Sequence, residues 1–329
     1  MNVLVTGGAG YIGSHCVKGL LEAGHNVTII DNFSTGYIQA VDERAKLYKA
    51  DIKNFYKVMS ILINNDIDTV IHFAAFSLVG ESMEVPLKYY DNNVYGTKVL
   101  LDAMAEANVK KIVFSSTAAV YGAQKEMPIT EEVLETPTNA YGETKLAMEK
   151  MMKWADIAHG IKYVALRYFN VAGAHHSGEI GENHHPETHL IPLILQVPLG
   201  KRSHISIFGS DYDTPDGTCV RDYIHIEDLI NAHMLAMDYL EKANDSNHFN
   251  LGSGKGYSVL EMIEAARQVT GHKIPAKQEA RRAGDPDILI ASSEKAMNVL
   301  GWERKYTDVK DIIRSAWKFH QNFKEGYIK

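Results

Sequence analysis

The chain has 329 residues, of which 45% are hydrophobic and 23% charged, and its formal net charge is −7. This length predicts about two domains, and the acidic balance excludes a dedicated nucleic-acid binder, which would present a basic surface. The two cysteines, Cys16 and Cys219, are too few and too far apart for a disulfide framework. No apolar run reaches the ~18 residues of a membrane span, and we expect a cytoplasmic protein.

The first half of the chain alternates short apolar runs with amphipathic helical patterns. This alternation is typical of an α/β fold with a doubly wound parallel sheet, and predicts a Rossmann domain over residues 1–173. The less regular remainder predicts a smaller α/β substrate domain over residues 174–329, with a soft boundary across which elements can interleave. The expected strands are 3–5, 27–30, 47–50, 69–73, 112–114, 163–166 and 205–208; the expected helices are 14–23, 86–107, 140–158, 190–197, 227–240, 258–269 and 309–323.

The first expected strand leads through a glycine-rich turn into a helix. The glycines satisfy two spacings, Gly7-x-x-Gly10-x-x-Gly13 and Gly8-x-Gly10-x-x-Gly13. Glycines let a pyrophosphate approach the backbone, and the helix N-terminus offers it free N–H groups. Asp31 ends the second strand, where a carboxylate accepts hydrogen bonds from ribose hydroxyls and repels a 2′-phosphate. Together these features predict an NAD site.

Polar residues also end the third and fifth expected strands. Asp51 ends the third, where it either reaches the adenine edge or caps a loop. Ser115, Ser116 and Thr117 end the fifth. Since the carboxyl ends of strands face the ligand crevice in open α/β sheets, one of these hydroxyls is placed to bridge a substrate oxygen and a catalytic group.

Tyr141 and Lys145 stand four residues apart at the start of the helix expected over 140–158, so they share a face. A lysine ammonium lowers the pKa of a nearby phenol, which can then remove a hydroxyl proton while hydride leaves the same carbon. The spacing alone carries little weight, because Tyr121 and Lys125 repeat it in a predicted loop. Of these two pairs, only Tyr141 and Lys145 lie on an expected helix after the fifth strand, and we interpret them as the acid–base group.

Nine further stretches match one known family: residues 3–15, 31–32, 72–75, 79–82, 89–94, 141–145, 167–170, 216–218 and 220–225. In them the chain resembles the extended short-chain dehydrogenase/reductase family, and within it the nucleotide-sugar 4-epimerases. The resemblance implies tightly bound NAD and interconversion of UDP-galactose and UDP-glucose in galactose metabolism. Hydride would pass from sugar C4 to NAD and return to the opposite face of a 4-keto sugar. A homodimer packed through residues 86–107 and 140–158 is also implied.

The same resemblance assigns roles to single residues. Tyr141 takes the proton of the sugar 4-hydroxyl with help from Thr117, while Lys145 holds the nicotinamide ribose and keeps the phenol acidic. The implied cofactor contacts are Gly7, Gly10, Tyr11, Ile12, Gly13, Asp31, Asn32, Asp51, Ile52, Phe73, Ala74, Ala75, Asn92, Ser115, Tyr141, Lys145 and Phe169. The implied contacts to the UDP-hexose are Thr117, Asn170, Leu190, Phe208, Arg221, Arg282, Asp285 and Leu289. Both arginines suit a diphosphate, which a guanidinium fork binds well.

Three positions depart from the family pattern. Thr117 replaces the serine of many members but keeps the hydroxyl. Ser77 replaces a lysine that some bacterial members place near the cofactor, which leaves that contact open. Leu289 is intermediate between the tyrosine of strict hexose enzymes and the small residue of N-acetyl-tolerant ones. UDP-N-acetylhexosamines and UDP-pentoses therefore stay alternative substrates.

Three rival functions share the cofactor chemistry or the fold. A sugar-nucleotide 4,6-dehydratase needs an acid and a base after the threonine, and Ala118 and Ala119 cannot transfer a proton. A dehydrogenase that releases NADH is not excluded by any spacing. A catalytically idle NAD-binding protein would have no need of Tyr141 and Lys145.

Five histidines gather between residues 175 and 189. His185-x-x-x-His189 has the spacing of a zinc-binding helix. Pro186 lies between these two, and no matching cysteine or glutamate arrangement is apparent in the sequence. We therefore expect no metal here and interpret the stretch as a polar loop near the sugar site.

Overall fold

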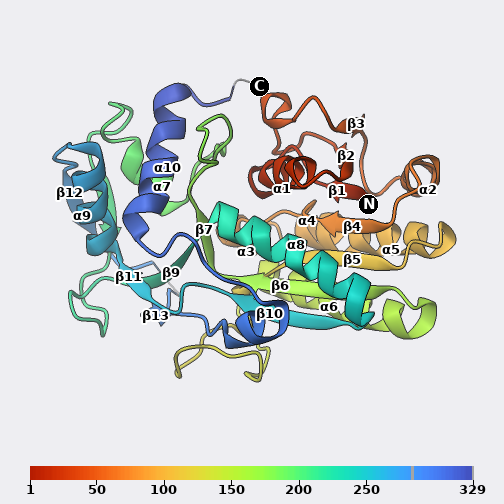
Figure 1. Cartoon of the computed structure of the whole chain (residues 1–329). Helices are drawn as coiled ribbons and strands as arrows, with labels where there is room; N and C mark the ends of the chain where they lie inside the picture. The colour runs from red at the N-terminus through yellow and green to blue at the C-terminus, as the bar shows by residue number, and fades with distance from the viewer. Residues whose placement is uncertain (283–284, 328–329) are drawn as a thin grey trace.

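The computed structural model describes residues 1–282 and 285–327. A sheet of seven strands lies at its centre, in the order β10-β6-β5-β4-β1-β2-β3 (Figure 1). All neighbouring strands are parallel, which confirms the predicted doubly wound fold. The strands are β1 (Asn2–Thr6), β2 (Asn26–Asp31), β3 (Lys46–Lys49), β4 (Thr69–His72), β5 (Lys111–Thr117), β6 (Lys162–Tyr168) and β10 (Asn247–Leu251).

Helices cover both faces of this sheet, because parallel strands are apolar on both sides and need two packed layers. One face is covered by α1 (Tyr11–Glu22) and α8 (Ile226–Ala243), which share a core with the strands. The other face is covered by α2 (Phe55–Asn64), α5 (Gly96–Glu106) and α6 (Ala140–His159). The helix expected over 86–107 consists of α4 (Pro86–Tyr89), a wider turn η2 (Tyr90–Tyr95) and α5.

A smaller group of elements begins where β6 ends. There β7 (Asn170–Ala172) pairs with β9 (Val220–His225), which also pairs with β11 (Gly256–Ser258) and β13 (Ile288–Leu289). A separate pair is formed by β8 (Ile205–Phe208) and β12 (Ala276–Glu279). Three helices pack against these strands around a common core and lie beside the main sheet in Figure 1: α7 (Leu190–Leu195), α9 (Val259–Thr270) and α10 (Val309–Asn322).

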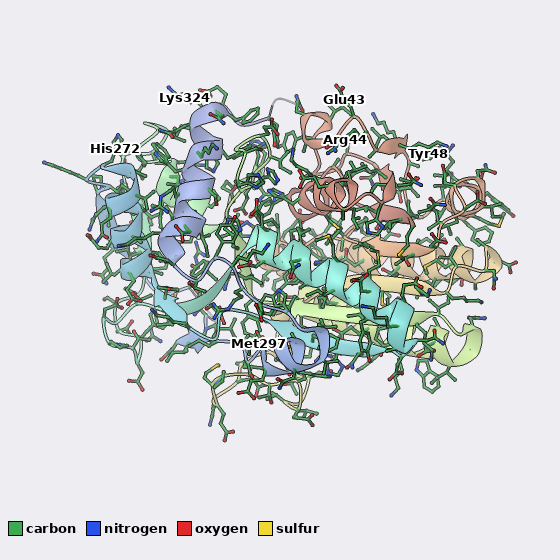
Figure 2. The ribbon with its side chains drawn as sticks, viewed as in Figure 1. Glu43, Arg44, Tyr48, His272, Met297 and Lys324 are labelled. Atoms are coloured by element: carbon green, nitrogen blue, oxygen red, sulfur yellow. The ribbon has the colours of Figure 1, made fainter. Side chains whose placement is uncertain are left out.

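Three short helices and α3 (Val79–Glu84) complete the described elements: η1 (Ile38–Ala40), η3 (Ala118–Tyr121) and η4 (Ala296–Leu300). Charged side chains such as Glu43, Arg44 and Lys324 lie at the outer surface (Figure 2). Cys16 and Cys219 are both free and buried. Within the described residues, no helix has the length and apolar character to cross a membrane.

The sequence analysis predicted neither α2 nor β10. Asn54 precedes α2, and its side chain accepts a hydrogen bond from the Lys57 N–H (3.1 Å), a local cap of the kind that asparagine often provides. By contrast, β10 owes its place to pairing with β6, where Phe249 lies opposite Leu166. The chain therefore returns to the main sheet from within residues 174–329.

A stripe of buried polar residues runs along α6 where it faces the sheet. Tyr141, Lys145 and Glu149 follow one another at intervals of four, so all three share a helix face, and all three are buried. The Lys145 ammonium donates a hydrogen bond to the carbonyl of Ser115 at 2.7 Å. The first turns of α6 are thereby held against the end of β5.

Glu149 holds the next turn of α6 through a buried ion pair. One carboxylate oxygen accepts a hydrogen bond from Nε of Arg167 on β6 (3.0 Å), and the other from Nη2 (2.5 Å). The Ser116 hydroxyl donates to the same carboxylate, and Nη1 of Arg167 donates to the Tyr121 hydroxyl (2.9 Å). The stripe thus joins α6 to two strands.

We expect Glu149→Ala to lower the free energy of unfolding by about 3 kcal/mol, because it leaves the buried Arg167 guanidinium without its main partner. Urea unfolding followed by circular dichroism measures the change. Glu143→Gln is the matched control, since Glu143 is exposed on the same helix, and its cost should stay below about 1 kcal/mol. Equal costs for the two variants would contradict the prediction.

Candidate active site

A cavity of about 510 Å³ lies at the carboxyl ends of the central strands. The strand order reverses between β1 and β4, and open α/β sheets bind ligands at such a point. The cavity wall includes most of the predicted site: Gly7, Gly10, Tyr11, Ile12, Gly13, Asp31, Asn32, Ile52, Phe73, Ala74, Ala75, Asn92, Ser115, Thr117, Tyr141, Lys145, Phe169, Asn170, Leu190, Arg221, Asp285 and Leu289. Ser77, where the family pattern varies, also lines the wall.

Three predicted site residues do not line the cavity, namely Asp51, Phe208 and Arg282. Asp51 accepts hydrogen bonds from the Asn32 side chain (3.2 Å) and the Lys53 N–H (2.8 Å), as a loop cap does. The Arg282 guanidinium lies over the ring of Phe208, 4.0 Å from its centroid. Ligand contacts for these three residues stay predictions.

The glycine loop folds tightly between β1 and α1. Gly7 has a φ of +75°, a conformation that glycine adopts without strain, and its carbonyl accepts a hydrogen bond from the Gly10 N–H (3.1 Å). A Cβ at Gly13 would lie 2.0 Å from the Gly7 oxygen, so this close approach admits only glycine. The first N–H groups of α1 have no partner within the helix, and they are available to a diphosphate.

Asp31 stands at the end of β2 with its carboxylate largely buried. One oxygen accepts a hydrogen bond from the Ala9 N–H (2.9 Å) and the other from the Phe33 N–H (2.8 Å). Burial raises the pKa of this carboxyl, while the two backbone hydrogen bonds lower it. The free lone pairs of the carboxylate can accept hydrogen bonds from a ribose, so the side chain fits the role predicted for it.

Tyr141 and Lys145 both line the cavity from the start of α6. Asn139 caps this helix by accepting a hydrogen bond from the Gly142 N–H (2.8 Å). Burial raises the pKa of Tyr141 to about 12, although the hydrogen bond with Thr117 lowers this pKa in part. Burial also lowers the pKa of Lys145 to about 7, although the negative charge of Glu149 acts in the opposite direction and raises it.

These pKa values correct one expectation. The Lys145 nitrogen lies 5.9 Å from the centroid of the Tyr141 ring, and in the protein alone burial keeps the pKa of the phenol raised despite this neighbour. A further positive charge beside the phenol would lower its pKa.

The hydroxyls that end β5 have separate partners. The Ser115 hydroxyl shares a hydrogen bond with the Tyr168 hydroxyl, and the Ser116 hydroxyl donates to Glu149, away from the cavity. Thr117 Oγ1 accepts a hydrogen bond from the Ala119 N–H (3.2 Å) and faces the cavity beside Tyr141. Of the three, Thr117 is therefore the one placed to act with the tyrosine.

The far wall of the cavity comes from the smaller part of the chain. Arg221 on β9 lies within reach of Asp285, with 3.3 Å between Nη2 and Oδ1. Glu182, His184 and His189 also line the wall, and the sequence analysis named none of them as a site residue. The signal available was the dense run of histidines and glutamates between β7 and α7, which was interpreted as a polar loop near the sugar site without assigning a role to any single residue of it.

Comparison with known proteins places the chain in a family. Residues 3–252 match the NAD dependent epimerase/dehydratase family. The chain is 56% identical over 327 residues to the UDP-glucose 4-epimerase of Lacticaseibacillus casei, which covers 99% of each protein. This chain belongs to the NAD dependent epimerase/dehydratase family. The resemblance found in the sequence is thereby confirmed.

Solved structures of the epimerase/dehydratase family share this fold over the full length. A crystal structure of a UDP-glucose 4-epimerase superimposes with a TM-score of 0.98 at 53% identity and covers 100% of both chains. The UDP-glucose 4-epimerase of Bifidobacterium longum, solved in complex with NAD⁺ and UDP, has a TM-score of 0.94 at 40% identity. It covers 99% of this chain and 100% of its own.

We expect Gly13→Ala to weaken NAD binding at least tenfold, about 1.4 kcal/mol, because the added Cβ displaces the loop at Gly7. Fluorescence titration with NADH measures the affinity. Gly80→Ala on α3 is the matched control, since no atom lies within 4 Å of the Cβ it adds. Equal affinity of the two variants would show that the glycine loop does not bind the cofactor.

Proposed function

We propose that this chain interconverts UDP-galactose and UDP-glucose with NAD as its cofactor. The observation that carries the proposal is that Tyr141, Lys145 and the glycine loop line one cavity. A relative that is 56% identical over its full length is a UDP-glucose 4-epimerase. The adjacent alanines after Thr117 leave a 4,6-dehydratase without its acid and base.

The residues of the glycine loop and the ends of β2, β4 and β5 would hold NAD. The chemistry that NAD supplies when bound is reversible acceptance of hydride from sugar C4, and return of that hydride to the other face inverts the carbon. The Asp31 carboxylate would accept hydrogen bonds from the ribose hydroxyls. The tight turn at Gly7 and Gly13 would let the diphosphate approach the backbone. Asp51 would contact the edge of the adenine ring of NAD.

Tyr141 would take the proton of the sugar 4-hydroxyl and later return it. A nicotinamide cation in the cavity would supply the positive charge that lowers the pKa of the buried phenol from about 12. Thr117 would hold the same sugar oxygen through its hydroxyl. Lys145, fixed by its hydrogen bond to the Ser115 carbonyl, would hold the nicotinamide ribose and support the acidity of the phenol.

The UDP-sugar would lie against the smaller part of the chain. Arg221 would bind its diphosphate, because a guanidinium forks onto phosphate oxygens, and Arg282 would assist from its place over Phe208. The remaining proposed contacts are Asn170, Leu190, Asp285 and Leu289. On this proposal residues 1–173 serve NAD and residues 174–329 serve the UDP-sugar, with α8 and β10 interleaved.

A coupled assay tests the reaction. UDP-galactose is supplied without added NAD⁺, and UDP-glucose is measured through UDP-glucose dehydrogenase in a second step after the epimerase is removed. We expect turnover, because the cofactor leaves each cycle unchanged. Release of one NADH per sugar consumed would instead identify a dehydrogenase and overturn the proposal. UDP-N-acetylgalactosamine is tested separately, with the product resolved by anion-exchange chromatography, and shows whether Leu289 admits an N-acetyl group.

Tyr141→Phe is expected to lower kcat at least 100-fold while NAD stays bound, since only the proton-transferring hydroxyl is removed. NAD content is measured after acid release from the purified variant. Unchanged activity would contradict the role of the phenol. Tyr121→Phe is the matched control, because Tyr121 is buried but lies outside the cavity lining.

The proposal includes a cytoplasmic homodimer. Its two thiols are free, as is usual in a reducing compartment. Leu87, Tyr95, Trp154 and Ile157 are exposed on the two stretches predicted to form the interface, residues 86–107 and 140–158. Exposed apolar side chains of this kind are typical of interaction surfaces.

Light scattering after size-exclusion chromatography should give twice the chain mass. We expect Trp154→Asp to shift the protein toward the monomer, because it places a charge in the interface. Leu134→Asp is the matched control, since Leu134 is an exposed apolar residue outside both stretches. A wild-type monomer would remove the homodimer from the proposal.

A further inference from the structure

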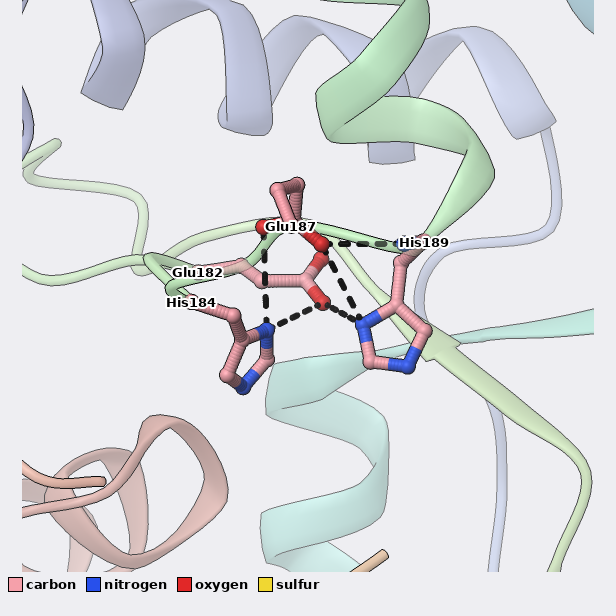
Figure 3. A group of neighbouring side chains, drawn as sticks. All are labelled: Glu182, His184, Glu187 and His189. Carbon is pink, nitrogen blue, oxygen red and sulfur yellow. Dashed lines mark hydrogen bonds and ion pairs between the residues drawn. The ribbon is translucent and has the colours of Figure 1, made fainter. Parts of the chain in front are cut away.

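Four side chains between β7 and α7 form a compact cluster: Glu182, His184, Glu187 and His189 (Figure 3). Each offers one ligand atom, and these atoms all lie within 4.8 Å of one another. We propose that the cluster binds one divalent transition-metal ion of the zinc type. Three of the cluster's members line the same cavity as Tyr141 and Lys145, and the test of the proposal does not depend on activity.

Three of the four separations between histidine nitrogens and carboxylate oxygens are close to those around a single ion, with Glu187 facing the two histidines through different carboxylate oxygens. Nδ1 of His184 lies 3.4 Å from Glu182 Oε1 and 3.7 Å from Glu187 Oε2, and Nδ1 of His189 lies 3.6 Å from Glu187 Oε1. Two ligands on a tetrahedral zinc ion are separated by about 3.3–3.6 Å, given bonds of about 2.0–2.2 Å. The remaining pair, His189 Nδ1 and Glu182 Oε1, is closer at 2.5 Å, and an ion between them would part them to the same spacing.

Two of the ligand atoms, Glu182 Oε1 and His184 Nδ1, are buried, and among the described residues their polar partners are ion-pair contacts within the cluster itself. The Glu182 side chain is only 4% exposed and that of Glu187 only 9%. In residues 1–282 and 285–327 the ion-pair partners of both carboxylates are His184 and His189, with no lysine or arginine. Buried carboxylates need positive charge beside them, and either two protonated histidines or one divalent ion balances both charges; the ion would in addition bind all four ligand atoms at once.

The donor set matches the preferences of zinc. Zinc binds imidazole nitrogens and carboxylate oxygens, and four protein ligands around a tetrahedral ion leave no open position, as in structural sites. Glu187 is already oriented, because its Oε1 accepts hydrogen bonds from the N–H groups of Thr188 (2.8 Å) and His189 (2.9 Å). The sequence analysis had paired His189 with His185, but His185 is exposed and His184 takes its place.

An ion here would connect the two parts of the chain. The His184 ring packs edge-on against Tyr11, the first residue of α1, with centroids 6.1 Å apart. His189 is the residue immediately before α7, whose first residue, Leu190, lines the cavity. One bound ion would thus fix the start of α7 relative to the glycine loop, a structural role with no step in the reaction.

Metal content and affinity test the proposal. The full chain is purified without a polyhistidine tag, stripped with a chelator, dialysed against Zn²⁺ and analysed by plasma mass spectrometry. We expect one zinc per chain, and binding at least tenfold weaker in His184→Asn and in Glu182→Gln, measured by competition with a chromophoric chelator. His185→Asn is the matched control and should bind like the wild type.

Two further measurements keep the result interpretable if a variant is unstable. Circular dichroism checks that each variant is folded, and Co²⁺ replaces Zn²⁺ to give the visible absorption typical of four-coordinate cobalt. We expect this absorption, and a rise of Tm on adding Zn²⁺, in the wild type and His185→Asn only. No stoichiometric uptake by the wild type, or equal loss in His185→Asn, would overturn the proposal and leave the histidines as protonated partners of the carboxylates.

Discussion

The attachment of α6 to the sheet by buried polar groups is the constraint on which the active site depends. Lys145 binds the Ser115 carbonyl, and Glu149 binds Arg167 one turn further along. Apolar packing alone tolerates small shifts of a helix, whereas a buried charge that loses its partner is strongly disfavoured. The position of the Tyr141 phenol at the cavity is therefore set by interactions one and two turns away from it.

The same burial makes the chemistry depend on the cofactor. It raises the pKa of Tyr141 and lowers that of Lys145, so both groups are shifted toward their neutral forms. In surroundings of low dielectric constant, a charge brought near the phenol acts more strongly than it would in water. On the proposed function, a site that is unfavourable for the tyrosinate by itself would respond strongly to a cationic ring, and proton transfer would be coupled to the presence of oxidised cofactor.

Sequence reasoning succeeded where the signal is local. The spacing of Gly7, Gly10 and Gly13 and the interval between Tyr141 and Lys145 are written in consecutive residues, and the structure brings all five to one cavity. It failed where position depends on distant contacts. β10 was missed because its pairing with β6 joins distant parts of the chain. The loop over 175–189 was placed near the sugar site, but Glu182 and His184 were not named as site residues, because their position at the cavity depends on packing against α1.

That stretch between β7 and α7 explains how two separately built parts can enclose one cavity. The Tyr11 hydroxyl donates a hydrogen bond to the Gly173 carbonyl (2.7 Å) at its beginning, and His184 packs on the same tyrosine ring further along. Tyr11 belongs to the loop that would hold the NAD diphosphate, while Leu190 belongs to the wall that would hold the sugar nucleotide. This polar segment is thus one of the connections between the two walls, beside the passages from β9 to α8 and from β10 to β11. On the proposed function, the two ligands would therefore be positioned relative to each other by this connection between the parts as well as by contacts within either part.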